Sequence, residues 1–256
     1  MISSKHIFGD SNRLFLNLDL GCSSECSYCY LPSEAIQIGR NNLDLDSRIS
    51  AQELHEHLCN DERFLHGPEG TLLSIGCYSE TWDPRNRENT VQLIKRLLCH
   101  GNNIQLATKR KVDTTDTKTI TEDEHWNKQL SIYISSTTLS HWKKYEKRTV
   151  PPNIRFSSFK SCADIGIPAV LYIKPVLPGI TILDADLFGK IIQEYNIPCI
   201  VGDMFKESNG GKVSPISKKL FVSEDDESRT LRGLLSTFGP VFATSEEAMI
   251  HIRKNQ

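Results

Sequence analysis

The stretch Gly21-Cys22-Ser23-Ser24-Glu25-Cys26-Ser27-Tyr28-Cys29-Tyr30-Leu31 places three cysteines at a C-x3-C-x2-C spacing. Thiolates are soft ligands, and three of them on one short loop can hold three irons of a cuboidal 4Fe–4S cluster. Such a cube usually has four cysteine ligands, so one iron would be open to chemistry, as catalytic metal sites are. A zinc knuckle and a disulfide are the alternatives. Zinc prefers four ligands, disulfides use cysteines in pairs, and no fourth Cys or His occurs in the next twenty residues.

Length and composition are those of an ordinary globular chain. The 256 residues suffice for one core of barrel size, and a net charge of −2 gives no global signature of a nucleic-acid or membrane binder. No apolar run approaches the ~20 residues of a membrane span, and no apolar segment after the N-terminus forms a signal peptide. We therefore expect no membrane partner and a reducing, cytoplasmic location. The cysteines outside the loop are predicted to be mostly buried small hydrophobes: Cys59, Cys77, Cys99, Cys162 and Cys199.

Short apolar segments alternate with amphipathic ones along most of the chain. The predicted strands cover residues 13–20, 71–76, 103–108, 129–135, 169–173 and 198–201. The predicted helices between them cover residues 51–59, 90–100, 114–128, 152–165 and 184–195, the last capped by Asp184. Such alternation implies parallel βαβ units, and six units are too few for a closed eight-unit barrel. The predicted fold class is therefore α/β, a laterally open, partial (β/α)6 TIM-like barrel.

The pattern changes after residue 201. A short strand is predicted at residues 219–222, a helix at 224–238, and a last helix at 246–254 with Ser245 as its cap. We divide the chain into a barrel, residues 1–205, and a C-terminal α/β extension, residues 206–256, packed on the barrel. In parallel barrels the catalytic groups gather at the C-terminal ends of the strands, and the cysteine loop follows the first strand at that end.

The cysteine motif, with Tyr28 at its aromatic position, resembles the hallmark C-x3-C-x-aromatic-C of the radical S-adenosylmethionine (radical SAM) superfamily. The resemblance implies that the open iron chelates the amino and carboxylate groups of SAM. It implies that an electron from the cluster cleaves SAM to methionine and a 5′-deoxyadenosyl radical, which abstracts a substrate hydrogen atom. It places Tyr28 beside the cofactor and calls for an electron donor of the flavodoxin or ferredoxin type.

The same resemblance assigns cofactor contacts to residues at the other strand ends. Ser79 and Thr81, after the second strand, can accept hydrogen bonds from the SAM ammonium, although an ordinary polar loop has the same composition. Lys109, after the third strand, can pair with the SAM carboxylate or belong to a solvated basic turn. Ser135 offers a hydroxyl, and Ile173 can flank the adenine, although it would be a core residue in any barrel.

Several segments, in chain order, resemble the spore photoproduct lyase-like branch of this superfamily. Residues 26–31 are similar to its C-x-Y-C-Y-L, Thr108-Lys109 to its Thr-Lys, residues 145–155 to its Glu-x-Arg…Pro…Arg, and residues 165–179 to its G-I-P…P-x-x-P-G. The lyases carry a hydrogen-donating cysteine close before Ser-Asp-Pro. Here five residues separate Cys77 from Asp83, so Cys77 is a candidate hydrogen-atom donor in a different context. Tyr30 can relay a hydrogen atom or pack under the cofactor.

The resulting hypothesis is a radical SAM enzyme that acts on a nucleotide, a nucleic-acid base or another small molecule. Residues 141–148 interleave cations and aromatics, a composition that suits a phosphate backbone with stacked bases and equally a solvated loop. Two alternatives stay open. One is a non-catalytic Fe–S or zinc protein for electron transfer or partner binding, and the other is an inactive barrel kept as a scaffold.

Overall fold

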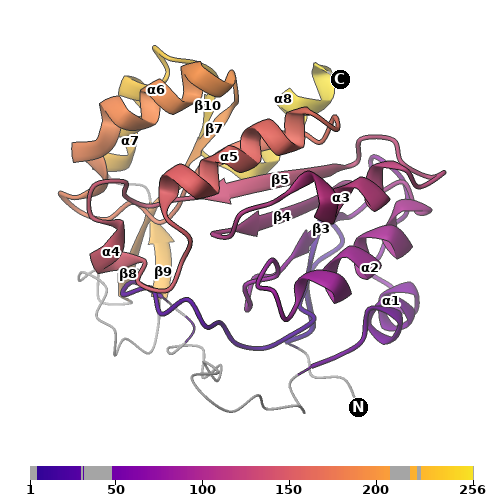
Figure 1. Ribbon diagram of the computed structural model, residues 1–256. Coiled ribbons are helices and arrows are strands. Elements are labelled where there is room, and N and C mark those ends of the chain that lie inside the picture. The colour runs from indigo at the N-terminus through magenta and orange to yellow at the C-terminus, as the bar shows by residue number, and fades with distance from the viewer. Residues whose placement is uncertain (1–4, 30, 32–47, 208–219, 224–225, 256) are drawn as a thin grey trace.

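The computed structural model describes residues 5–29, 31, 48–207, 220–223 and 226–255 (Figure 1). Its main feature is an open eight-stranded sheet with the order β1-β2-β3-β4-β5-β6-β7-β10. Neighbouring strands from β2 to β10 are parallel, and β1 runs antiparallel to β2. The strands are β1 (Ile7–Gly9), β2 (Arg13–Leu16), β3 (Leu72–Ile75), β4 (Ile104–Thr108), β5 (Leu130–Ser135), β6 (Ala169–Ile173), β7 (Cys199–Val201) and β10 (Val241–Phe242). A separate antiparallel pair joins β8 (Met204–Glu207) and β9 (Leu220–Ser223).

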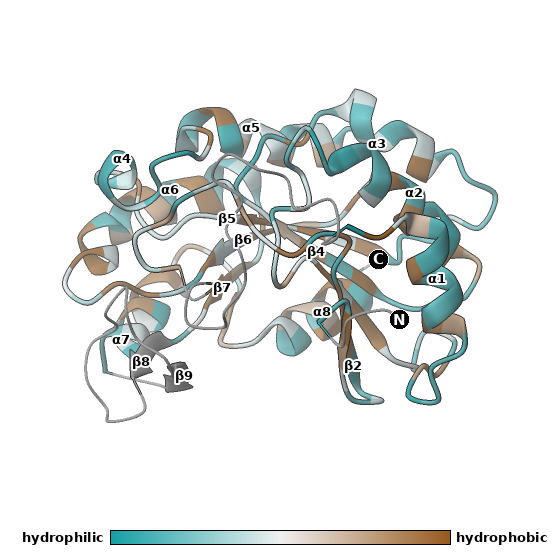
Figure 2. Ribbon diagram, turned by 90° about the horizontal axis from the view of Figure 1, so that it is seen from below, coloured by the Kyte–Doolittle hydropathy of each residue, from teal (hydrophilic) through white to brown (hydrophobic). Residues whose placement is uncertain are grey.

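Helices connect the parallel strands. They are α1 (Ala51–Cys59), α2 (Arg87–Leu98), α3 (Thr114–Thr121), α4 (Trp142–Tyr145), α5 (Pro152–Ala163), the 3-10 helix η2 (Thr181–Asp184), α6 (Ala185–Tyr195), α7 (Asp226–Leu235) and α8 (Ser245–Lys254). Figure 2 shows α1, α2, α3 and α5 on one side of the sheet and α8 on the other. The predicted succession of six parallel strands with intervening helices is confirmed. None of the helices in the described ranges has the length and apolar character that a membrane span needs.

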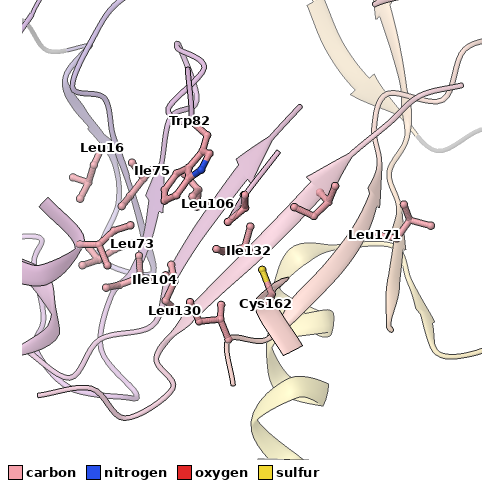
Figure 3. Close-up of a cluster of buried hydrophobic side chains, with 14 of the residues drawn as sticks. Leu16, Leu73, Ile75, Trp82, Ile104, Leu106, Leu130, Ile132, Cys162 and Leu171 are labelled. Carbon is pink, nitrogen blue, oxygen red and sulfur yellow. The ribbon is translucent and has the colours of Figure 1, made fainter. Parts of the chain in front are cut away.

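The core lies between the sheet and the outer helices, and strand periodicity builds it. Alternate residues of neighbouring strands point toward the helices, as Figure 3 shows for Leu73 and Ile75, Ile104 and Leu106, and Leu130 and Ile132. These side chains are almost fully buried, and each such burial contributes about 1.5–3 kcal/mol. The intervening residues of the same strands face the concave side, where the polar and aromatic side chains lie.

Helix α8 covers part of this concave side. Its Ala248 and Ile252 pack against the inward residues Tyr133, Val170 and Ile200. The hydroxyl of Tyr133 donates a hydrogen bond to the carbonyl of Ser245 at a distance of 3.3 Å. The C-terminal region therefore contributes a strand, β10, to one edge of the sheet and a helix to its inner face.

The structure corrects several predicted details of these elements. α3 ends at Thr121, because residues 122–128 form turns. Asp184 does not cap α6 with its side chain, since its carboxylate accepts hydrogen bonds from Thr138, Leu139 and Ser140. Cys59 and Cys99 are exposed rather than buried, whereas Cys162 and Cys199 are buried as predicted.

The N-cap of α8 is Thr244, one residue before the predicted Ser245. The Thr244 hydroxyl accepts a hydrogen bond from the Glu247 amide at 3.2 Å, and the Glu247 carboxylate accepts the Thr244 amide at 3.2 Å. This reciprocal pattern is a capping box, which satisfies two amides at the helix end. The sequence Thr244-Ser245-Glu246-Glu247 carries its signature, whereas Ser245 has Ala248 three residues later.

Thr244→Ala is expected to lower the free energy of unfolding by about 1 kcal/mol, because it removes the oxygen that satisfies the Glu247 amide. Urea denaturation followed by circular dichroism measures this change. Thr230→Ala in α7 is the control and is expected to be nearly neutral, since the Thr230 hydroxyl donates to the Asp226 carbonyl of its own helix. Equal effects of the two substitutions would contradict a capping role.

Candidate active site at the C-terminal strand ends

The cysteine loop is fixed between two other loops at the C-terminal edge of the sheet. On one side the Gly21 amide donates to the Tyr78 carbonyl at 2.9 Å, and Gly21 forms a parallel bridge with Ser79. On the other side Cys26 forms an antiparallel bridge with Glu146, and the Ser27 amide donates to the Tyr145 carbonyl at 2.9 Å. Backbone hydrogen bonds therefore hold the loop to the segments that follow β3 and β5.

The three cysteines of the loop line one cavity of about 500 Å³. Burial raises the pKa of the Cys22 thiol, with a further rise from Glu80. Burial also raises the pKa of Cys26 to about 12, against the opposing effect of Lys109, and the pKa of Cys29 to about 11. The thiols are thus protonated at neutral pH in the metal-free chain, and a metal that binds them must displace their protons.

A buried polar network supports the loop from behind. The Tyr28 hydroxyl donates to Glu146 Oε1 at 2.6 Å, and Arg155 Nη1 donates to Glu146 Oε2 at 2.9 Å. The Thr137 amide also donates to Glu146 Oε1, at 3.1 Å. Glu146 and Arg155 are both fully buried. Burial favours the neutral form of Glu146, but Arg155 and Lys109 outweigh it and hold the pKa of this carboxyl below its usual value.

Lys109 brings a positive charge into the cavity. Its Nζ donates to the Ser135 hydroxyl at 2.6 Å and lies 3.8 Å from Glu146 Oε1. It also lies 5.8 Å from the centre of the Tyr28 ring. The predicted cofactor residues Tyr28, Lys109 and Ser135 are therefore together, and all three line the cavity beside the cysteines.

The segment after β3 contributes Cys77, Ser79 and Glu80 to the cavity wall. The Glu80 carboxylate accepts hydrogen bonds from the Thr108 hydroxyl at 2.5 Å and from the Lys109 amide at 3.0 Å. Glu80 thereby joins the end of β3 to the end of β4. Glu80 was not among the predicted site residues, although it directly follows Ser79 and comes four residues after the end of the predicted strand 71–76.

Two predicted cofactor residues lie away from the cavity lining, and one candidate catalytic residue is not described. The Thr81 side chain is buried, and its methyl group faces Gly76, where a Cβ would lie 2.1 Å from Thr81 Cγ2. Gly76 also has a φ of +87°. The turn that starts this segment therefore needs a glycine, both for this backbone angle and because a Cβ would clash with Thr81. The Ile173 side chain belongs to the core on the outer face of β6, whereas its neighbour Tyr172 lines the cavity. Tyr30 lies outside the described residues.

The cavity continues inward to a polar floor. Arg13 Nε and Gln105 Nε2 both donate to the Ser74 hydroxyl, at 2.8 and 2.7 Å. Arg13 Nη1 also pairs with Glu246, in the first turn of α8, at 2.6 Å. Among the described residues, nothing bonds the buried Gln105 Oε1. This floor was not predicted, because it depends on α8 meeting the concave face of the sheet.

The cationic and aromatic segment predicted for nucleic-acid contact includes the short helix α4. Lys143 lies over the Trp142 ring at 5.9 Å from its centre, and Lys144 lies over the Tyr145 ring at 5.1 Å. The backbone of Tyr145 also holds the cysteine loop through Ser27. Nucleic-acid contact at this segment stays a prediction.

Solved structures share this fold. A spore photoproduct lyase complexed with dinucleoside spore photoproduct is 13% identical, with a TM-score of 0.58 over 89% of this chain and 75% of that one. A variant of that lyase with bound AdoMet and dinucleoside spore photoproduct is 12% identical, with a TM-score of 0.59 over 90% of this chain and 76% of that one. SuiB from Streptococcus suis bound to S-adenosylmethionine is 13% identical, with a TM-score of 0.62 over 94% of this chain and 52% of that one.

These similarities establish the fold, and they confirm the predicted partial barrel and its likeness to the spore photoproduct lyase. The chain spans about half the length of SuiB. No protein-family profile and no curated protein sequence matches the chain.

Proposed function

We propose that the protein is a radical SAM enzyme whose cysteine loop holds a 4Fe–4S cluster and whose cavity binds SAM and a small substrate. The observation that carries the proposal is the position of Cys22, Cys26 and Cys29. Their thiols line one cavity at the C-terminal strand ends, in a fold shared with proteins solved with SAM or AdoMet bound. Parallel barrels place their chemistry at this edge.

The residues present fit the cluster. Three thiols from one anchored loop supply soft ligands, and Cys77 is the one further cysteine among the described residues that line the cavity. When bound, the cluster supplies the electron that cleaves SAM to methionine and the 5′-deoxyadenosyl radical. Lys109, which favours the thiolate form of Cys26, offsets part of the negative charge that three thiolates bring into the buried site.

The surrounding side chains have complementary roles toward SAM. Lys109, already positioned by Ser135, donates to the methionine carboxylate of SAM. The Ser79 hydroxyl and the Glu80 carboxylate accept hydrogen bonds from its ammonium group. Tyr28 packs beside the cofactor. Its hydroxyl donates to Glu146, which is paired with Arg155, and this hydrogen bond holds the cysteine loop in position. Cys77 is the candidate hydrogen-atom donor to a substrate radical.

The polar floor suits the substrate. Gln105 Oε1 is a buried acceptor, and Tyr133 and Arg13 line the same cavity. A substrate that presents an N–H or O–H group at this depth would satisfy Gln105, and a pyrimidine base or another amide-bearing small molecule has such a group. Incubation with deuterated candidates, starting with thymine dinucleotides, tests this part through deuterium transfer into 5′-deoxyadenosine.

The test of the whole proposal is anaerobic reconstitution with iron and sulfide, followed by SAM and dithionite. The expected result is a brown protein that releases 5′-deoxyadenosine. In the cell a flavodoxin- or ferredoxin-type donor would replace dithionite, in a reducing cytoplasm. The second candidate, a zinc or electron-transfer protein, predicts zinc in place of iron, or a cluster that releases no 5′-deoxyadenosine. Either result would overturn the proposal.

Lys109→Met is expected to raise the KM for SAM of the cluster-loaded protein by about 10- to 100-fold, because a hydrogen bond to a charged group contributes about 1.5–3 kcal/mol. Initial rates of 5′-deoxyadenosine release at several SAM concentrations measure this effect. Lys111→Met is the matched control, since Lys111 pairs with Asp113 at the surface at 2.5 Å. A normal KM in the Lys109 variant would remove Lys109 from the SAM site.

A further inference from the structure

A second group of metal-binding side chains lies on the outer helices. It consists of His55 and Cys59 of α1 and His100, two residues after the end of α2. The two imidazole Nε2 atoms are 2.8 Å apart. Cys59 Sγ lies 3.6 Å from His55 Nε2 and 3.8 Å from His100 Nε2. One ligand atom from each residue therefore lies within 4.8 Å of the others.

We propose that His55, Cys59 and His100 bind one divalent zinc-type ion. In a tetrahedral zinc site with Zn–N of about 2.0–2.1 Å and Zn–S of about 2.3 Å, nitrogen and sulfur ligands lie about 3.6 Å apart. The two S···N distances here match that value. The N···N distance has to lengthen from 2.8 Å to about 3.3 Å for the same geometry, which a small rotation of either ring provides.

Local structure explains why these three side chains converge. His55 and Cys59 are four residues apart on a helix and so share one face. α1 and α2 pack against each other, and His100 follows the C-cap residue of α2. A second contact orients His100, because its Nδ1 lies 3.1 Å from His66 Nδ1 and its ring packs edge-on against His66. A hydrogen bond on the far nitrogen fixes the ring with Nε2 toward the metal, as metal-bound histidines commonly show.

The fourth position can be filled by water, because Cys59 is exposed. Imidazole and thiolate ligands together favour zinc among the common cellular ions, whereas magnesium and calcium prefer oxygen.

This site is separate from the proposed cluster. α1 ends before β3 begins, and His100 comes just before β4, so the group lies at the edge where the strands start. The cysteine loop lies at the opposite edge, after β2 ends. A metal here would link the C-terminal ends of α1 and α2 and so stabilise the packing of these two helices. It would have no part in the chemistry of the cavity.

The test measures zinc bound to the 256-residue chain after dialysis against a weak chelator. The chain also carries Cys22→Ala, Cys26→Ala and Cys29→Ala together, so that the loop cannot take the zinc. The expected result is one equivalent of zinc and a Tm that rises with added zinc. His100→Ala and Cys59→Ser on the same background are expected to lose both, and His66→Ala to weaken zinc binding by about 10- to 100-fold. His57→Ala, an exposed histidine of the same helix, is the control and should behave like the parent.

Two outcomes would overturn the inference. One is a parent that retains no zinc and shows no rise in Tm, which would mean that the short N···N contact is only a hydrogen bond between the two rings. The other is zinc retained equally by the His100→Ala and Cys59→Ser variants, which would place it elsewhere. Neither outcome depends on whether the cysteine loop binds a cluster, so failure here leaves the proposed function standing.

Discussion

Cys26→Ala, reconstituted anaerobically, is expected to retain no stable 4Fe–4S cluster and to release 5′-deoxyadenosine at least about 100-fold more slowly than the unmodified chain. That loss is larger than the loss of activity or metal affinity, about 10- to 100-fold, that follows removal of a residue that only hydrogen-bonds a metal ligand. Cys26 is the middle ligand of the three and is the one held by a backbone bridge to Glu146. Iron and sulfide content, the visible spectrum and product release are the measurements.

Cys77→Ala is the control that separates ligands from other cavity cysteines. Cys77 lines the same cavity but comes from the segment after β3. If three thiolates hold the cluster, this variant keeps its iron and still cleaves SAM, and only the fate of the substrate radical changes. A loss of cluster as large as that of Cys26→Ala would reveal a four-thiolate centre with no open iron, and the proposed SAM chemistry would fail with it.

The parts of the fold that sequence could predict are those with a strong local period. α1 was predicted at its observed limits because Ser50 is a good N-cap and Leu54 and Leu58 mark a buried face. β6 was likewise predicted at its observed limits. β10 was not predicted because a strand of two residues is too short to show an alternation of apolar and polar side chains. It forms by pairing in parallel with the edge of β7.

The candidate site divides in the same way. The cysteine loop has a local signature, and Lys109 and Ser135 follow from their positions at strand ends. Ile173 was predicted to contact the cofactor, but its neighbour Tyr172 lines the cavity instead. Which alternate residues of β6 face the cavity depends on the register of β6 with β5, and the sequence alone does not define that register. Glu146 and Arg155 belong to residues 145–155, whose sequence shows only a resemblance to the lyase branch. Their pairing depends on tertiary contacts, since the chain brings together a loop residue and a residue of α5.

The Glu146–Arg155 pair carries the other large prediction. Glu146→Gln is expected to lower the free energy of unfolding of the metal-free chain by about 3–5 kcal/mol, because it leaves the fully buried charge of Arg155 without the carboxylate that balances it. Arg155→Met should lower the free energy of unfolding by a similar amount, since it leaves the Glu146 carboxylate buried beside Tyr28 and Thr137 without the Arg155 charge. Urea denaturation under anaerobic conditions measures both.

The double variant Glu146→Gln with Arg155→Met tests whether the two losses share one cause. Because the double variant removes both members of the fully buried pair, its loss should be clearly smaller than the sum of the single losses. Asp164→Asn is the control for an exposed pair, since Lys160 Nζ lies 2.8 Å from Asp164 Oδ1 on the surface of α5 and the change should cost under about 0.5 kcal/mol. The two pairs have nearly equal distances and differ in burial, so a small effect of Glu146→Gln would mean that the network behind the cysteine loop does not hold it in place.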